Sequence, residues 1–473
     1  MRRISLYLSL ALLSIPAQGI TITVEPGDQI ADSLLSLSQG DTLFLMPGVY
    51  IDTTEQPLLT AGPVQSGVTI TSMPDNRAVL DGQGIERSVI NLTGPHDLDV
   101  ILENLIITGG NATGSEAFNG GGISASESKA IISNCLVTEN TALIGGGIGA
   151  EGGILQIQYS TVSDNEALVT GGGIDLYACD FTGFMVGFLS NTSSDDGGGI
   201  NAYQSTLDLS NSLFTGNCSG DDGGAIAVLQ GTSNFSFLTI HSNEAFDDGG
   251  GIRIHTVDSI SITSSIVTSN LGKAGINVIS VNIPFISHVC CWDNTFSNYN
   301  GMEDPTGTNG NISEDPLFAD TDLNISQIAA GQSVDSPALN SGHASVENTC
   351  IAGFSTRTDS LPDTGISDMG FHHINYEQTG ISPEQPAERV GMTLTPSPAT
   401  TNVKVTVSPE ISAPVVIHVY DITGRRIHTA DSVNMTEKNS WIWNPDDSFP
   451  GGLVLFRAVW SDGSASGRVV LLR

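Results

Sequence analysis

The chain has 473 residues, of which 51 are acidic and 16 are basic, so its formal net charge is −35. An acidic chain repels the phosphate backbone that supplies most nucleic-acid affinity, which excludes a protein that binds nucleic acid through phosphate contacts. Hydrophobic residues make up 39% of the chain. This is enough to bury a core, so the composition also excludes a wholly disordered protein. The length predicts two or three domains.

Residues 1–19 have the pattern of a cleaved export signal. The basic Arg2 and Arg3 precede a mostly apolar run over residues 4–15, and Ala17-Gln18-Gly19 offers small residues at the cleavage point. The run is shorter than the roughly 20 residues needed to span a bilayer. We therefore predict an exported mature chain that begins near Ile20. The alternative is a buried N-terminal helix.

Export permits disulfides. The cysteines are sparse for this length and lack the paired spacing of a zinc site. One expectation is one or two bridges, with Cys290, Cys291 and Cys350 tying the end of a domain, and the other is free buried thiols. The six cysteines are Cys135, Cys179, Cys218, Cys290, Cys291 and Cys350.

A repeat of about 26 residues dominates the middle of the chain, and it is marked by two columns that run in step. Two independent columns with one period predict a solenoid. Equivalent asparagines should hydrogen-bond from coil to coil and form a structural ladder. The first column is a Gly-Gly-(Gly/Ala)-Ile tetrad that ends at Ile123, Ile148, Ile174, Ile200, Ile226 and Ile252. The second column is Asn140, Asn165, Asn191, Asn217, Asn243 and Asn270.

Within each repeat the apolar residues alternate with a period of two, which predicts strands with inward positions such as Ile174 and Leu176. Three short strands per coil, stacked at about 4.8 Å, describe a parallel β-helix. About ten coils between Asp41 and Cys291 would make a rod of about 48 Å. Residues 29–39 predict an amphipathic helix that covers the first coil.

Several segments resemble known bacterial families. Residues 40–50 (GDTLFLMPGVY) resemble the opening coil of right-handed parallel β-helix, pectate-lyase-like proteins, and the tetrads, with Phe-Thr-Gly-Asn at 214–217, resemble the polymorphic outer-membrane protein repeat. Residues 310–318, 335–342 and 363–372 (DTGISDMGFH) resemble the closing segment of surface-anchored β-helix proteins. These resemblances imply an all-β, right-handed parallel β-helix over residues 20–375, with an N-terminal cap, a closing segment and export.

The end of the chain differs in charge and pattern. Residues 376–390 have the composition of a linker, whereas residues 391–473 carry seven basic and seven acidic side chains and alternate in short apolar runs, which predicts a small immunoglobulin-like β-sandwich. Residues 396–398 (PSP), 419–426 (VYDITGRR) and 468–473 (RVVLLR) resemble the C-terminal sorting domain of the type IX secretion system. This resemblance implies passage across an outer membrane by that machinery. A generic immunoglobulin-like cap or a carbohydrate-binding module is the alternative.

Pairs of aspartates recur just before the glycines at intervals of 26 residues. Stacked carboxylates repel one another, so they either splay into solvent or hold a cation, and Ca²⁺ suits clustered carboxylates. Solvated acidic turns and a Ca²⁺ ladder are therefore the two predictions. The residues are Asp195, Asp196, Asp221, Asp222, Asp247 and Asp248.

A second candidate site lies on the outer face of the strand that follows the glycines. Two tyrosines there would stack on sugar rings while polar neighbours bind sugar hydroxyls. The alternative is an ordinary exposed strand face. The outward residues are Asp175, Tyr177, Asn201, Tyr203, Arg253 and His255.

The sequence predicts no catalytic residue. Polygalacturonases have a similar fold, and an aspartate pair with Arg253-Ile254-His255 partly resembles their site, but their Gly-His-Gly is absent. A pair repeated in three coils also gives acid and base one environment, whereas catalysis needs two. We predict a secreted or outer-membrane-surface rod, adhesin-like or glycan-binding and monomeric, without nucleic acid. The alternative is a polysaccharide lyase or glycoside hydrolase that acts on an acidic polysaccharide.

Overall fold

The structure is a computed structural model that describes residues 19–51, 56–114 and 120–374 and seven strands between residues 391 and 471. Contacts divide the chain into two compact units, Met1–Gly380 and Ile381–Arg473. The predicted export signal, apart from Gly19, and the predicted linker lie outside the described residues.

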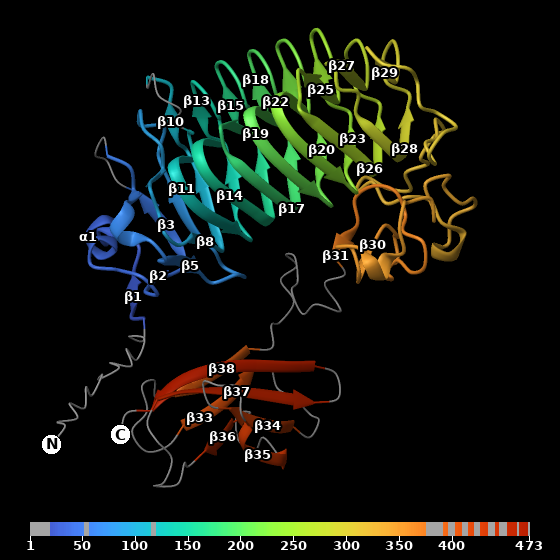
Figure 1. Cartoon of the computed structure of the whole chain (residues 1–473). Helices are drawn as coiled ribbons and strands as arrows, with labels where there is room; N and C mark the ends of the chain where they lie inside the picture. Colours follow the sequence, from blue (N-terminus) through green and yellow to red (C-terminus); the bar gives the residue numbers. More distant parts are fainter. Residues whose placement is uncertain are drawn as a thin grey trace, which may run out of the picture. The chain divides into compact units, whose positions relative to one another are not determined.

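The first unit is a parallel β-solenoid of about ten coils, and its strands lie side by side from β1 to β29 (Figure 1). Each coil contributes to three faces. Seven long strands bend at the corners, so each of them belongs to two or three of these faces. These strands are β11 (Ile123–Ser133), β14 (Ile148–Ser163), β17 (Asp180–Leu189), β19 (Ile200–Ser210), β22 (Ile226–Ser236), β26 (Ser259–Thr268) and β28 (Phe285–Trp292).

The first face contains the strands that follow the glycine tetrads. Its separate strands are β4 (Leu59–Ala61), β7 (Ile90–Thr93), β16 (Ile174–Tyr177), β25 (Ile252–His255), β27 (Ile276–Ile279) and β29 (Tyr299–Asn300). The second face begins with β1 (Thr21–Val24), β2 (Thr42–Leu45), β5 (Thr69–Ser72) and β8 (Val100–Glu103). The third face contains β3 (Gly48–Ile51), β6 (Ala78–Asp81), β9 (Leu105–Thr108), β12 (Leu136–Thr138), β20 (Leu213–Thr215) and β23 (Thr239–His241).

A short ladder of two-residue strands follows the asparagine column. It consists of β10 (Asn111–Ala112), β13 (Thr141–Ala142), β15 (Glu166–Ala167), β18 (Thr192–Ser193), β21 (Cys218–Ser219) and β24 (Glu244–Ala245). The predicted inward positions, among them Ile174, Leu176, Phe188 and Phe214, are buried in one continuous core. The rings of Phe188 and Phe214 stack with centroids 4.5 Å apart.

Most corners are held by residues other than glycine in the left-handed conformation. One such residue stands at the corner between the second and third faces in successive coils, including Tyr159, Met185, Asn211 and Phe237 with φ of 45° to 55°. This conformation is strained for an L-residue. It is stabilised by the neighbouring coils, whose backbone groups hydrogen-bond to the same residues. The backbone N–H of Asn211, for example, donates to the Ser236 carbonyl at 3.0 Å.

The asparagines of the second column form a continuous buried ladder. Each side-chain amide donates to the Oδ1 of the next asparagine at 2.8–3.0 Å, and the backbone N–H donates to the same oxygen. Asn294 extends the ladder beyond Asn270 with an N···O distance of 2.9 Å. The 26-residue period did not predict Asn294 as part of the ladder, because it follows Asn270 by only 24 residues.

The helix at the start of the solenoid is shorter than predicted. Helix α1 (Ile30–Leu35) buries Ile30 and Leu34, whereas the sequence predicted a helix over residues 29–39. The carboxylate of Asp41 accepts hydrogen bonds from the backbone N–H groups of Ser38 and Ile20, which turns the chain from the helix into β2.

A closing segment follows the last coil and packs against one corner of the solenoid. It contains three-residue 3₁₀ turns η2 (Ile328–Ala330) and η3 (Val346–Asn348) and the antiparallel pair β30 (Phe354–Ser355) and β31 (His373–Ile374); η1 (Pro63–Gln65) lies earlier. Phe237 and Ile266 of the solenoid join small apolar clusters with this segment. All six cysteines are free, so the expected bridges are wrong. The alternative of free buried thiols is confirmed for four of them, whereas Cys218 is half-buried and Cys350 is exposed.

The second unit contains two antiparallel sheets. One has the order β32 (Gly391–Thr395), β33 (Val403–Ser408), β36 (Ser440–Trp443). The other has the order β35 (Arg426–Val433), β34 (Val415–Tyr420), β37 (Gly452–Trp460), β38 (Gly463–Leu471). The unit is therefore all-β in its described strands.

Asn191→Ala should lower the free energy of unfolding by about 2–4 kcal/mol, because it removes the amide that donates to the Val162 carbonyl and the oxygen that accepts from the backbone and side-chain N–H groups of Asn165 in the core. Asn234→Ala is the matched control, because its exposed amide bonds only to surface groups, donating to Asp208 at 3.4 Å and accepting from the Ser261 hydroxyl at 2.5 Å. Urea unfolding followed by circular dichroism measures both. Equal losses in the two variants would contradict a stabilising role of the ladder.

Candidate functional site

The predicted tyrosines lie in one outward column of the first face. Tyr177 on β16 and Tyr203 on β19 are adjacent in register, and the column continues through Leu229 to His255. The two rings stack on each other with centroids 5.6 Å apart and planes 24° apart. Because each ring covers one face of the other, a sugar ring cannot lie between them.

The polar neighbours of these tyrosines are buried, which differs from an exposed strand face. Asp175, Asn201 and Arg253 are 2%, 7% and 8% exposed. The first glycine of each tetrad lies directly over them: a Cβ on Gly171 would come within 2.6 Å of Asp175 Cβ. The tetrads therefore need glycine there because the turn covers the next strand closely.

The buried polar groups bind one another. The Asn201 amide donates to Asp175 Oδ2 at 2.8 Å. Burial raises the pKa of Asp175 to about 6, although hydrogen bonds from Asn201 and Thr170 oppose the rise. Arg253 donates to Asp222 Oδ2 at 2.8 Å and to Asn277 Oδ1 at 3.3 Å. These residues support the turn from below rather than facing solvent.

The aspartate pairs divide into an exposed row and a half-buried row. Asp195, Asp221 and Asp247 are exposed. In the half-buried row, Asp196 accepts a hydrogen bond from the backbone N–H of Asp222, which in turn accepts one from the N–H of Asp248, at 3.2 and 2.9 Å.

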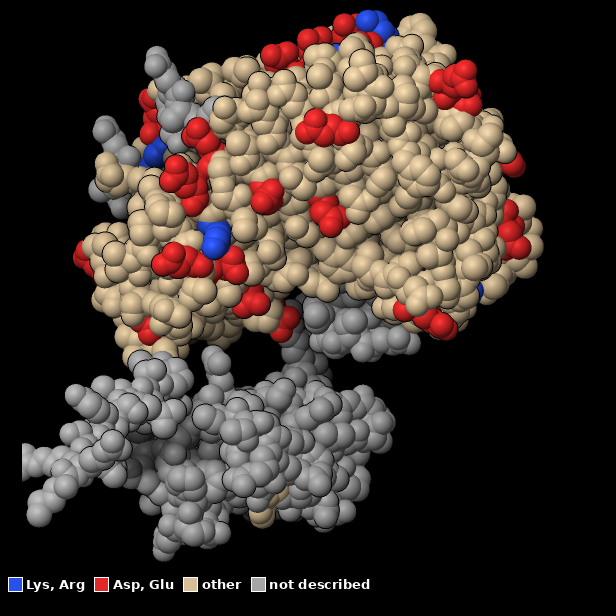
Figure 2. Space-filling view, in the orientation of Figure 1, with Lys and Arg blue, Asp and Glu red and all other residues tan. Residues whose placement is uncertain are grey.

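Ligand oxygens of two overlapping triplets lie within 4.8 Å of one another, which is a geometry that can hold a cation. Figure 2 shows acidic side chains in a row along the edge of the solenoid that carries the turns before the glycine tetrads, with a basic side chain at the end of the row. The triplets are Asp195 with Asp196 and Asp221, and Asp221 with Asp222 and Asp247.

The row is not electrostatically uniform. Asp222 pairs with Arg253, and Lys273 pairs with Asp247 and with Asp248 at 3.3 Å, whereas no ion pair of the described residues includes Asp196. Burial, with the charges of Asp222 and Asp195, raises the pKa of Asp196 to about 6. Burial also raises the pKa of Asp222, and hydrogen bonds from the Asp248 N–H and Arg253 oppose that rise.

A groove that the sequence analysis missed runs over the second face. Outward hydroxyl, amide and carboxylate groups of β19, β22 and β26 line it, and we call it the trough; it encloses about 550 Å³. The ring of Phe285, 58% exposed, lies at its end on β28. The polar groups of its floor include Thr206, Asp208, Thr232, Asn234 and Ser261.

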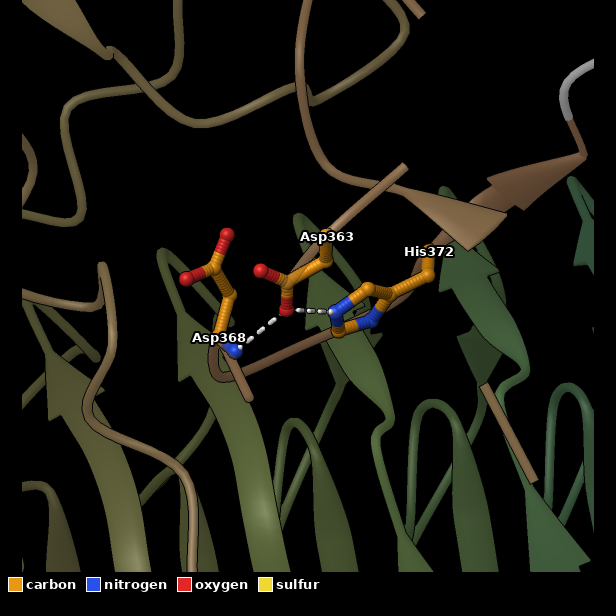
Figure 3. Close-up of side chains that lie close together, drawn as sticks. All are labelled: Asp363, Asp368 and His372. Atoms are coloured by element: carbon orange, nitrogen blue, oxygen red, sulfur yellow. Dashed lines mark hydrogen bonds and ion pairs between the residues drawn. The ribbon is translucent and has the colours of Figure 1, made fainter. Parts of the chain in front are cut away.

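A buried cluster of Asp363, Asp368 and His372 lies in the closing segment (Figure 3). His372 Nε2 lies 3.2 Å from Asp363 Oδ2, and the same oxygen accepts a hydrogen bond from the Asp368 backbone N–H at 2.9 Å. Burial and the charge of Asp363 raise the pKa of Asp368.

The sequence carried a signal for this cluster but not for the trough. The buried cluster falls within the closing motif DTGISDMGFH, which brings two aspartates and a histidine, all residue types that can bind a metal, within ten residues. The trough has no motif, because isolated serine, threonine and asparagine residues on a strand are ordinary surface residues.

No known protein family, curated protein or solved structure matches this chain. Among the described residues, no helix has the length and apolar character required to cross a membrane.

Asp196→Asn should stabilise the protein at pH 7.5 by about 1 kcal/mol, after a discount for partial exposure. The pKa of Asp196 in the folded state, about 6, lies above its usual value of 3.8. Its contribution to stability is therefore present below pH 4 and is lost as pH rises through 6. The gain should disappear at pH 4 in thermal melts. Asp180→Asn, at an exposed carboxyl, is the control, and an equal gain at both pH values would contradict the prediction.

Proposed function

We propose that this chain is a secreted or outer-membrane-surface β-helix protein that binds extracellular glycan in an adhesin-like role. The observation that carries this proposal is the trough. Sugars bind through hydrogen bonds to hydroxyls and through packing on aromatic rings, and the trough offers both. Asp208 is the only charged residue among those that line it, which favours a neutral glycan.

The sequence supports the location. The export signal, the right-handed pectate-lyase-like and polymorphic outer-membrane protein resemblances, and a C-terminal immunoglobulin-like domain of the type IX sorting kind together suggest a monomeric rod delivered to the cell surface by secretion machinery. The acidic charge of −35 disfavours a nucleic-acid partner.

The aspartate turns support a proposed Ca²⁺ site. The exposed carboxylates approach one another without a basic partner at Asp195 and Asp221 among the described ion pairs, and Ca²⁺ accepts several carboxylate and carbonyl oxygens in a flexible geometry. Bound Ca²⁺ would relieve the repulsion along the row.

Asp221→Asn should abolish most Ca²⁺ binding, because Asp221 belongs to both triplets of carboxylates. Isothermal titration of the mature chain with CaCl₂ measures the affinity and stoichiometry. Asp180→Asn, an exposed aspartate on the second face outside both triplets, should bind as the wild type does. If the wild type does not bind Ca²⁺ at millimolar concentration, the proposed Ca²⁺ site is wrong and the aspartate pairs are solvated acidic turns.

One observation favours a second candidate, a polysaccharide lyase or glycoside hydrolase. The uneven row places Asp196, with its raised pKa, beside Asp222, which is paired with Arg253. Two carboxyl groups in different environments are what acid and base catalysis requires. Release of reducing ends or unsaturated uronate from an acidic polysaccharide, lost in Arg253→Met, would support this candidate over a binding rod.

Phe285→Ala should weaken glycan binding about tenfold, because it removes the aromatic surface at the end of the trough. A glycan array with the mature chain identifies the ligand, and titration gives the dissociation constants. Phe296→Ala is the matched control, because Phe296 is 89% exposed and does not line the trough. Binding that is insensitive to Phe285 and to Asn234 would exclude the trough as the site.

A further inference from the structure

The cluster in the closing segment has a geometry beyond that of an ion pair. Asp363, Asp368 and His372 are 9%, 1% and 0% exposed, and a ligand atom of each lies within 4.8 Å of the others. His372 Nδ1–H donates to the Gly370 carbonyl at 2.9 Å, which fixes the ring and directs Nε2 toward Asp363.

The cluster places two carboxyl groups beside a single basic side chain in the interior. Two carboxylates lie together in the interior, and the one basic side chain within ion-pair distance among the described residues is His372. Arg357 acts on both carboxylates only from a distance, because its guanidinium binds Asp359 nearer the surface. Burial of carboxylates is favourable only when they are neutralised, either by a proton or by a bound cation.

We propose that Asp363, Asp368 and His372 bind a divalent metal ion of the zinc type, which ties the closing segment to the solenoid. Neutral imidazole and carboxylate together suit Zn²⁺, and its charge balances the two carboxylates. Three protein ligands leave the fourth position of a tetrahedral site to a water molecule, and bonds of 2.0–2.2 Å in that geometry give ligand separations of about 3.4 Å. The 3.2 Å between His372 Nε2 and Asp363 Oδ2 is close to that value.

The hydrogen bonds around the cluster resemble those that orient the ligands of a bound metal ion. Metal-binding histidines usually donate their second ring N–H to a carbonyl or carboxylate, and the carboxylate ligands are themselves hydrogen-bonded. Here the Gly370 carbonyl accepts from His372. The backbone N–H groups of Thr364 and Asn340 donate to Asp363 and Asp368, each at 2.7 Å.

The site would pin a segment that crosses three coils. The backbone N–H of His372 donates to Asn211, that of Phe371 to Thr239 and that of Gly370 to the Ser264 carbonyl, at 2.7, 2.9 and 2.9 Å. A metal bound at His372 would hold this strap against the solenoid. This role is structural and does not depend on glycan binding.

The test uses the full chain, unfolded in guanidinium with EDTA and refolded either with EDTA or with Zn²⁺, because the buried site must load during folding. We expect about one Zn²⁺ per chain by elemental analysis after desalting, and a melting temperature several degrees higher than that of the EDTA sample. Refolding with Co²⁺ should give the visible absorption of a tetrahedral site.

His372→Gln and Asp363→Asn should lose the retained Zn²⁺ and the Co²⁺ absorption, whereas His255→Gln, on the first face, should keep both. If neither site variant folds, the comparison of wild-type protein refolded with EDTA and with Zn²⁺ still tests the proposal. A wild-type chain that retains no Zn²⁺ and melts at the same temperature with EDTA and with Zn²⁺ would overturn the proposal and leave a buried hydrogen-bonded cluster without a metal. Equal loss of Zn²⁺ in His255→Gln would also overturn it.

Discussion

The solenoid depends on one interaction, the hydrogen bond from each coil to the same position in the next. On the faces this bond joins backbones, and at the corner after the third face it joins asparagine side chains inside the core. A buried amide is tolerated only when its donors and acceptors are all used. The ladder therefore permits one register between coils, since a shift by one residue would break every hydrogen bond from one asparagine to the next. That register in turn brings the aspartates and tyrosines of successive coils together.

The glycine turn shows how the same constraint shapes the surface. Because the first glycine of each tetrad covers the outward residue of the next strand, the polar groups at Asp175 and Arg253 became part of the packing rather than an open site. Tyr177 and Tyr203, two residues further along their strands, lie beyond the cover and remain partly exposed. The exposure of outward side chains thus changes within two residues on one face. The alternation of inward and outward residues along a strand does not by itself predict this change.

The 26-residue period allowed the solenoid, the inward columns and the asparagine register to be predicted from sequence, because each repeat imposes the same local pattern. Burial of Asp175 could not be predicted, since it depends on the height of a turn above a strand. The contacts of His372 with coils about 160 residues earlier were equally inaccessible. They join a unique segment to the repeat, and periodicity carries no information on such a pair. The trough could not be predicted for the same reason, because it ends where the non-repeating Phe285 interrupts a column of small polar residues.

Repetition also limits what the repeat itself can do. Equivalent residues in successive coils receive nearly equal environments, which suits the binding of a long ligand or a row of ions but gives no single group a distinct reactivity. Distinct behaviour arises where the period is broken: Arg253 beneath Asp222, Lys273 at the end of the aspartate row, Phe285 at the end of the trough, and the closing strap with His372. These four places lie in the last third of the solenoid or beyond it. A chain that grew by duplication of coils would therefore gain its specificity from the coils that no longer match the others.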